Sequence, residues 1–199
     1  MFITNKTASF IISFLRKNSS LSETDLVKID YGIKVIVSNF IKFVILITTA
    51  YFLNIIKYTL FSIFVFGFIR LFASGVHASS TLECIILNYT IFFGIVYLSL
   101  YTKLPIWLII IIFIISVFLL ILYSPADTKT RPLISKKLRK SLKIKSIITC
   151  LILFIVSLSI KSSVYKNLIT YSVFMACFVI TPLCYKIFRQ PYNNYLNFN

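Results

Sequence analysis

The residues of this chain that are most capable of chemistry lie close together, between Arg70 and Cys84. This stretch holds the single histidine of the chain, His77, together with one of its four cysteines and one of its four glycines, Gly75. A thiolate beside an imidazole is the pair that nucleophilic catalysis by cysteine uses, with the imidazole as general base and acid. The residue types therefore indicate a cysteine nucleophile, provided that the chain brings His77 and Cys84 together.

The spacing of the pair requires a break in the helix between its two members. His77 and Cys84 are seven residues apart, so on one continuous helix they would be about 10 Å apart along its axis. The stretch Ser80-Thr-Leu-Glu83 matches the S-x-x-E capping box and predicts that a helix begins at Ser80. Cys84 would then lie in the first turn, beside free backbone N–H groups and the positive end of the helix dipole, which favour a thiolate.

Each of these residues also has a structural interpretation. A cysteine in an apolar chain is usually a small packing residue, and a histidine at the start of a helix is often only an interfacial polar residue. Cys150, Cys177 and Cys184 lie in apolar stretches away from charge and are predicted to be packing residues. The cysteines form no CxxC pair, and with one histidine they make a poor set of ligands, so neither a metal nor another cofactor is expected.

The composition indicates that membrane-spanning helices position these residues. The chain has 199 residues, of which 59% are hydrophobic and 13% are charged. A soluble domain contains about 25% charged residues and at most ~50% apolar ones, and a disordered chain is less apolar still. Apolar stretches that approach the ~20 residues needed to cross a bilayer occur at 35–53, 82–101, 104–123, 147–160 and 164–184. A sixth, at 58–69, has only twelve residues and is interpreted as tilted or re-entrant.

The distribution of basic residues predicts the orientation of these segments across the membrane. The chain carries 21 Lys and Arg against 5 Asp and Glu, a formal charge of +16. In a soluble protein this would suggest nucleic acid, but cytoplasmic loops of membrane proteins collect Lys and Arg, so no nucleic-acid partner is expected. With the N-terminus inside and six segments, sixteen basic residues fall on the cytoplasmic side and four on the other.

We therefore predict an all-α, polytopic integral membrane protein with about six membrane-embedded segments and both termini in the cytoplasm. The chain contains no internal repeat, and residues 1–199 are expected to form a single membrane domain. Within it we expect an N-terminal interfacial amphipathic region at 1–34, a cytoplasm-facing catalytic segment at 70–84 and a basic cytoplasmic loop at 124–146.

The pattern R-x-x-x-x-G-x-H from Arg70 to His77, followed by Cys84, resembles the signature of the accessory gene regulator protein B (AgrB) family. Members of this family are membrane-embedded cysteine endopeptidases of Gram-positive quorum sensing. They often carry two adjacent glycines before the histidine, whereas this chain has Ser74 at the first of these positions.

A second segment of the chain resembles the same family. Residues 124–132, SPADTKTRP, are similar to its Pro-Ala-Asp…Pro element and include Asp127. They follow a long apolar stretch and precede a basic segment, as this element does in the family. The length and the number of segments also agree, so the resemblance covers most of the chain.

The resemblance implies an activity and a site. AgrB-type enzymes cut a short membrane-associated propeptide and release its acidic C-terminal tail. Carried over to this chain, Cys84 would be the nucleophile that forms a thioester acyl-enzyme, and His77 the general base and acid. A cysteine or serine of the propeptide would then attack the thioester and close a thiolactone or lactone ring. The expected location is the plasma membrane of a Gram-positive bacterium.

Other residues are expected to support this site. Arg70 would either hold a carboxylate of the substrate or anchor its helix at the lipid headgroups. Gly75 would supply backbone freedom, and Glu83 would be a helix cap rather than a third catalytic residue. Asp127 would orient its own loop, without an assigned catalytic step. The bases from Lys129 to Lys145 would attract either an acidic peptide tail or anionic lipid.

Two other classes of function remain open at this point. A small transporter or peptide-export component would carry His77 and Cys84 without covalent chemistry, and would tolerate replacement of the thiol. A structural or lipid-binding membrane protein would need neither residue. Beyond the propeptide and the lipid bilayer, the expected partner is a second copy of the chain, as a homodimer.

Overall fold

The predicted all-α class is confirmed. The computed structural model describes residues 2–18, 22–76, 80–128 and 131–198. Within these ranges the regular elements are helices, and β-structure is limited to two isolated bridges. The chain divides into two compact units, Met1–Phe52 and Leu53–Asn199.

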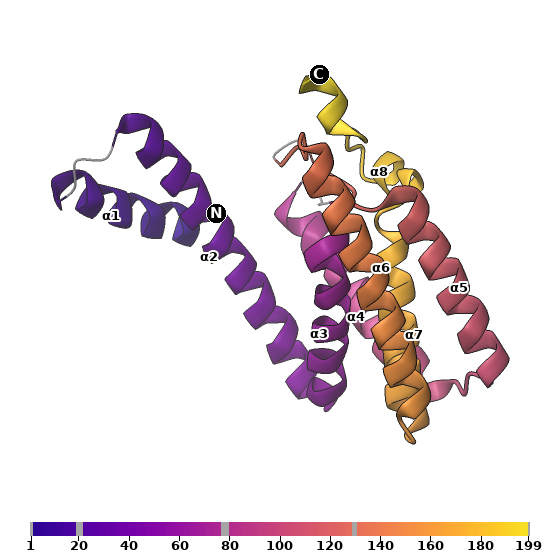
Figure 1. Cartoon of the computed structure of the whole chain (residues 1–199). Helices are drawn as coiled ribbons and strands as arrows, with labels where there is room; N and C mark the ends of the chain where they lie inside the picture. The colour runs from indigo at the N-terminus through magenta and orange to yellow at the C-terminus, as the bar shows by residue number, and fades with distance from the viewer. Residues whose placement is uncertain (1, 19–21, 77–79, 129–130, 199) are drawn as a thin grey trace. The chain divides into compact units, whose positions relative to one another are not determined.

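The first unit is a pair of packed helices (Figure 1), α1 (Phe2–Asn18) and α2 (Glu23–Phe52). Helix α1 and the start of α2 make up the region 1–34, whose interfacial position stays a prediction. The Ser22 hydroxyl accepts the backbone N–H of Asp25 at 3.2 Å, which caps the start of α2. The apolar segment expected at 35–53 is the C-terminal part of this helix of 30 residues.

The second unit is a helix bundle built around one central helix (Figure 1). Helix α7 packs against α3, α4, α5 and α6. Its buried residues lie on several sides of the helix and are Asn167–Thr170, Ser172, Val173, Ala176 and Cys177. A helix surrounded by protein tolerates small polar side chains such as Ser172, because it does not face lipid. The elements of the unit are α3 (Ile56–Ala73), α4 (Thr81–Tyr101), α5 (Ile106–Tyr123), α6 (Lys136–Ser159), α7 (Ser163–Phe178), α8 (Pro182–Ile187) and the 3₁₀ helix η1 (Asn194–Phe198).

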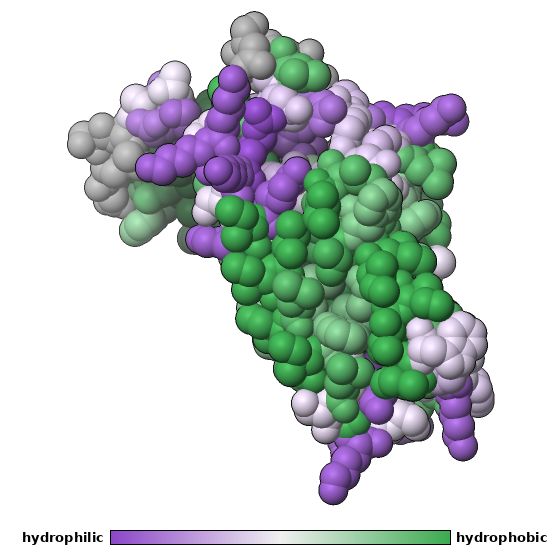
Figure 2. Space-filling model, turned by 45° about the vertical axis from the view of Figure 1, so that its right-hand side comes forward, coloured by the Kyte–Doolittle hydropathy of each residue, from purple (hydrophilic) through white to green (hydrophobic). Residues whose placement is uncertain are grey.

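Five of the described helices, α2 to α6, are long and apolar enough to cross a membrane. Much of their apolar surface is exposed: Ile114 on α5 and Ile155 on α6 are both 63% accessible. Figure 2 shows this surface as a broad hydrophobic band with hydrophilic side chains above and below it. Such a band is favourable only in contact with lipid, which supports the predicted membrane protein.

The segment at 58–69, expected to be tilted or re-entrant, is part of a longer helix. Helix α3 extends at both ends of that run, to Ile56 and Ala73, and is long enough to span. The charge at Arg70 does not end the helix, because its guanidinium is half-buried and donates to the Val76 carbonyl at 3.0 Å. A charged side chain that has a hydrogen-bond acceptor can lie near the end of a spanning helix.

Two other segments also differ from the sequence-based expectation. The basic segment 124–146 is a loop only as far as Ser135, whose hydroxyl accepts the Leu138 N–H at 3.3 Å and caps α6. Its last eleven residues form the first turns of α6, since Lys and Arg are good helix formers. The apolar stretch 164–184 is divided between α7 and α8. The sixteen residues of α7 rise about 24 Å, less than the ~30 Å hydrocarbon core of a bilayer.

Candidate active site and its surroundings

The start of α4 confirms the predicted capping box. The Ser80 hydroxyl accepts the Glu83 N–H at 3.1 Å, and the Glu83 carboxylate accepts the Ser80 N–H at 3.2 Å. Glu83 is thus fully explained as a cap, and its side chain is exposed. The Cys84 N–H makes the first bond of the helix, to the Ser80 carbonyl at 3.1 Å, so the cysteine lies in the first turn.

The Cys84 thiol differs in its surroundings from the other cysteines. It is half-buried, whereas Cys150, Cys177 and Cys184 are buried, as expected of packing residues, and all four are free. One turn further along α4, the Asn88 side-chain amide lies 4.0 Å from the Cys84 sulfur and donates a weak hydrogen bond to it.

The proposed partner of Cys84 lies outside the described residues. His77 belongs to residues 77–79, between Val76 and Ser80. On one side of it Val76 is buried, and on the other Ser80 caps α4. The predicted pairing of His77 and Cys84 stays a prediction.

The loop that follows α3 is held against the loop that follows α5. The Gly75 N–H donates to the Ala126 carbonyl at 3.1 Å, and the Ala126 N–H donates to the Ala73 carbonyl at 2.9 Å. The Val76 N–H donates to the Val179 carbonyl at 3.4 Å. The two motifs that resemble the AgrB family are therefore in direct backbone contact at one end of the bundle, although 50 residues separate them.

This loop has a backbone that favours glycine at two successive positions. Gly75 has φ +127°, and Ser74 has φ 58° with ψ −135°. A Cβ on Gly75 would lie 3.2 Å from the Ile180 Cγ2 and 3.3 Å from the Arg70 Nη2. The expected backbone freedom of Gly75 is confirmed, and close packing adds a second reason for the residue.

Arg70 is half-buried and holds the loop that follows its helix, and its expected role toward a substrate or a lipid headgroup stays a prediction. Its guanidinium donates to the Val76 carbonyl and lies 5.6 Å from the ring centre of Phe66. Arg70 thus fastens the loop after α3 to the end of its own helix.

Asp127 organises the C-terminal end of the chain. It is 3% accessible, and its carboxylate accepts the backbone N–H groups of Asn194 at 2.9 Å and of Tyr195 at 2.7 Å. The same carboxylate accepts the Leu133 N–H at 3.4 Å, so it closes its own loop, as expected. The bonds to Asn194 and Tyr195 were not foreseen, because no local pattern links these positions to residue 127.

Tyr185 is a further residue of this region that the sequence did not single out. Its hydroxyl donates to the Asp127 carbonyl at 2.7 Å, and the side chain is 1% accessible. Burial raises the pKa of Tyr185, and the neighbouring Asp127 carboxylate raises it further. The hydroxyl therefore remains a protonated donor that joins α8 to the loop after α5.

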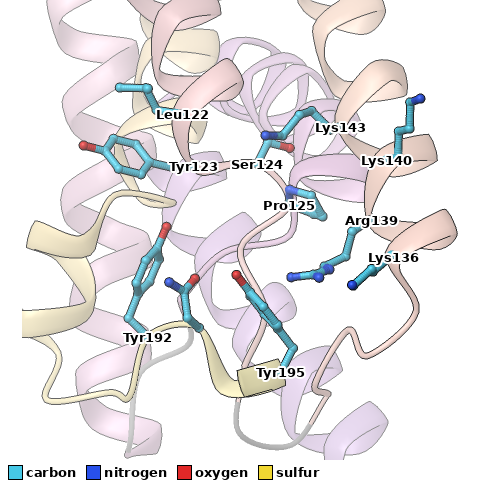
Figure 3. A pocket seen from close by; sticks show the side chains of 11 residues that line it. Leu122, Tyr123, Ser124, Pro125, Lys136, Arg139, Lys140, Lys143, Tyr192 and Tyr195 are labelled. Atoms are coloured by element: carbon cyan, nitrogen blue, oxygen red, sulfur yellow. The ribbon is translucent and has the colours of Figure 1, made fainter. Parts of the chain in front are cut away.

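A cationic pocket of about 310 Å³ lies beside this loop (Figure 3). Its basic side chains come from the first turns of α6, and its aromatic ones come from the end of α5 and from the C-terminal segment. The Arg139 guanidinium lies 3.6 Å from the ring centre of Tyr195. The residues concerned are Tyr123, Lys136, Arg139, Lys140, Lys143, Tyr192 and Tyr195. In the ranges that the structure describes, no three His, Cys, Asp or Glu side chains come together that could hold a metal ion.

The apolar helices and the cysteine at the start of a spanning helix define the class, an all-helical membrane protein. Residues 8–180 match the family described as accessory gene regulator B. The chain belongs to the accessory gene regulator B family, as its two motifs predicted.

Relatives at about 30% identity extend over nearly the whole chain. An AgrB-like protein of Clostridium acetobutylicum is 31% identical over 98% of this chain and 94% of its own length. The accessory gene regulator protein B of Staphylococcus aureus is 32% identical over 93% of this chain and 97% of its own length. An AgrB-like protein of Listeria innocua is 30% identical over 87% and 85%. No solved structure matches this chain.

Proposed function

We propose that this chain is a membrane cysteine endopeptidase that matures a short quorum-sensing propeptide, with Cys84 as the nucleophile and His77 as the general base and acid. Membership of the accessory gene regulator B family supports the substrate class. The observation that carries the proposal is the position of the Cys84 thiol, half-buried in the first turn of a doubly capped helix. Such a position stabilises a thiolate at a membrane boundary.

In the first step the Cys84 thiolate attacks the carbonyl carbon at the cleavage site of the propeptide. The C–N bond breaks, the N-terminal part of the propeptide remains on Cys84 as a thioester, and the acidic tail leaves as an amine. His77 supplies the proton that the amine takes. The Asn88 amide donates to the Cys84 sulfur and would orient it for this attack.

In the second step a thiol or hydroxyl of the bound propeptide attacks the thioester carbonyl. The new thioester or ester bond closes the ring, Cys84 leaves as a thiolate, and His77 takes the proton of the attacking group. Transfer of the acyl group from Cys84 to the attacking group keeps the carbonyl in a reactive ester or thioester, whereas hydrolysis would turn it into a carboxylate. The site therefore has to exclude water. A site at the end of a helix bundle whose sides contact lipid is suited to this requirement.

The test is co-expression of the chain with a short amphipathic propeptide encoded beside it, followed by mass spectrometry of the peptide. We expect loss of the C-terminal tail and formation of a ring with the wild-type chain, and an intact propeptide with Cys84→Ala. Cys150→Ala is a matched control, because it removes a buried thiol of the same bundle and should leave processing in place.

A propeptide that is shortened equally with and without Cys84 would refute the proposal. A propeptide that stays whole but crosses the membrane in a chain-dependent manner would favour the transporter. Rapid quenching in acid adds a direct criterion, because the proposal requires a peptide joined to the chain through Cys84 that hydroxylamine releases.

A further inference from the structure

We infer that the seam between α5 and α6 is a binding site for one anionic phospholipid, with its phosphate in the cationic pocket and an acyl chain in an apolar groove further along the same two helices. This inference is independent of the peptidase proposal, because it uses neither Cys84 nor His77.

The first support is the composition of the cationic pocket. Its lining carries four basic side chains and three tyrosines and has no acidic residue. Figure 3 shows the side chains of Lys136, Arg139 and Lys143 turned toward the loop at Ser124 and Pro125. Guanidinium, ammonium and phenol groups are the donors that bind phosphate oxygens.

The hydroxyl of Tyr192 is protonated and can donate to a phosphate. Burial, together with the neighbouring hydroxyls of Tyr123 and Tyr195, raises the pKa of Tyr192 to about 12. The nearby Asp127 carboxylate, which also contributes, is already occupied by the backbone N–H groups of Asn194 and Tyr195. A protonated phenol donates to a phosphate, and the nearby carboxylate does not compete for the lysines.

The second support is a groove on the same pair of helices. It has a volume of about 410 Å³ and is lined only by apolar side chains, Ile110, Phe113, Ile114 and Val117 from α5 and Leu151 and Phe154 from α6. The rings of Phe113 and Phe154 are 4.9 Å apart and form the contact between the two helices at this level. An open, purely apolar groove on a spanning helix pair accommodates a hydrocarbon chain.

The third support is the register that connects the two sites. Residues three or four positions apart lie on the same face of a helix. One such face of α6 carries Lys136, Lys140, Lys143, Ile147, Leu151 and Phe154. The stripe changes from basic to apolar at Lys143, whose ammonium also donates to the Ile121 carbonyl of α5 at 2.9 Å. From Lys143 to Leu151 the helix rises about 12 Å, so the headgroup and the acyl region of one lipid reach both sites.

An acidic peptide would be attracted by the same four bases, but it would leave the groove unused. A phospholipid uses both halves of the stripe, and basic pockets between spanning helices are typical headgroup sites. The observations therefore favour lipid, and an acidic peptide becomes an outcome of the test.

The test is native mass spectrometry of the full chain, purified in a neutral detergent and titrated with phosphatidylglycerol or with phosphatidylcholine of the same acyl chains. We expect one phosphatidylglycerol to be retained at concentrations at which phosphatidylcholine is not. Lys136→Gln with Lys140→Gln should weaken this binding about 25-fold, or about fivefold for each lysine. Both lysines are exposed, so the fold should not depend on them.

The matched control is Lys137→Gln with Lys145→Gln, which removes the same charge from the same helix but from outside the pocket lining. This variant should bind phosphatidylglycerol as the wild type does. Equal losses in the two double variants would overturn the site, because they would indicate only a diffuse positive field. The inference also fails if an acidic peptide displaces the lipid from the wild type but not from Lys136→Gln/Lys140→Gln, or if glycerol phosphate without acyl chains binds as tightly as the lipid.

Discussion

The carboxylate of Asp127 accepts the backbone N–H of Tyr195 at 2.7 Å, and this bond joins positions 68 residues apart. Together with the bond from the Asn194 N–H at 2.9 Å, it places the negative carboxylate at the start of η1, where the free N–H groups of a helix are. The C-terminal segment is thereby held beside the loop after α5, where Tyr192 and Tyr195 complete the wall of the cationic pocket.

Replacement of Asp127 by Asn should release this segment. An amide offers one acceptor oxygen instead of two, so at least one buried N–H is left without an acceptor at a cost of about 1–3 kcal/mol. We expect faster proteolysis after residue 187 and a lower unfolding temperature in detergent. Glu23→Gln, at an exposed site of the first unit, is the control and should change neither. Unchanged proteolysis in D127N would contradict the role of the carboxylate.

Ser80→Ala should affect the proposed active site more than a comparable loss of a cap elsewhere. Removal of an N-cap hydroxyl costs about 1 kcal/mol, and here it frays the turn that holds Cys84. Ser135→Ala removes the same kind of cap from α6. Both variants should lose similar stability in thermal unfolding, but only S80A should slow propeptide cleavage. Equal cleavage by the two would show that the order of this turn does not matter.

The two neighbours in the loop after α3 should respond in opposite directions. Gly75→Ala combines a positive φ with a contact at 3.2 Å to Ile180 and should destabilise the protein by on the order of 1–3 kcal/mol. Ser74→Gly relieves a non-glycine residue at φ 58° and should be neutral or stabilising. Chemical unfolding of both variants measures the difference. A destabilised S74G would mean that the serine side chain makes a contribution of its own.

Iodoacetamide should label the folded protein at Cys84 alone, because the other three cysteines are buried. Peptide mapping after timed labelling gives the result, and labelling of Cys150 at the rate of Cys84 would contradict the burial of Cys150.

The stability of the protein should fall at alkaline pH in a manner that depends on Tyr192. An unfolded tyrosine ionises near pH 10, whereas burial raises the pKa of Tyr192 to about 12 in the folded protein. The folded state therefore binds the phenol proton of Tyr192 more tightly than the unfolded state does. The resulting contribution to the free energy of unfolding is complete below about pH 10 and is lost as the pH rises toward 12. Unfolding of Tyr192→Phe should show a smaller decline over this range, and an equal decline would exclude Tyr192 as the cause.

Much of the site could be predicted because its determinants are local. The S-x-x-E pattern defined the start of α4 to the residue, since both bonds of a capping box connect positions three apart. Gly75 was identified by a backbone requirement that few other residues meet. The buried cysteines followed from the apolar stretches around them. The all-α membrane class followed from composition and the length of the apolar segments.

The remainder depends on contacts between distant segments. No sequence pattern near Asp127 predicts its hydrogen bonds to Asn194 and Tyr195. The extent of α3 was underestimated because an arginine normally ends an apolar segment, and only the folded loop shows that the Val76 carbonyl satisfies the Arg70 charge. The first turns of α6 were expected as a loop, because the apolar pattern gives no information about a strongly basic helix.

The central position of α7 bears on the order in which the chain is made. This helix is short for a bilayer and carries Asn167, Thr170 and Ser172 on buried positions, so its free energy of transfer into lipid alone is poor. Its four neighbours, α3 to α6, all precede it in the chain. Ribosomal synthesis therefore delivers the surrounding helices first, and α7 enters a protein-lined space rather than bare lipid. A nascent chain that stops before residue 163 is left with an open interior.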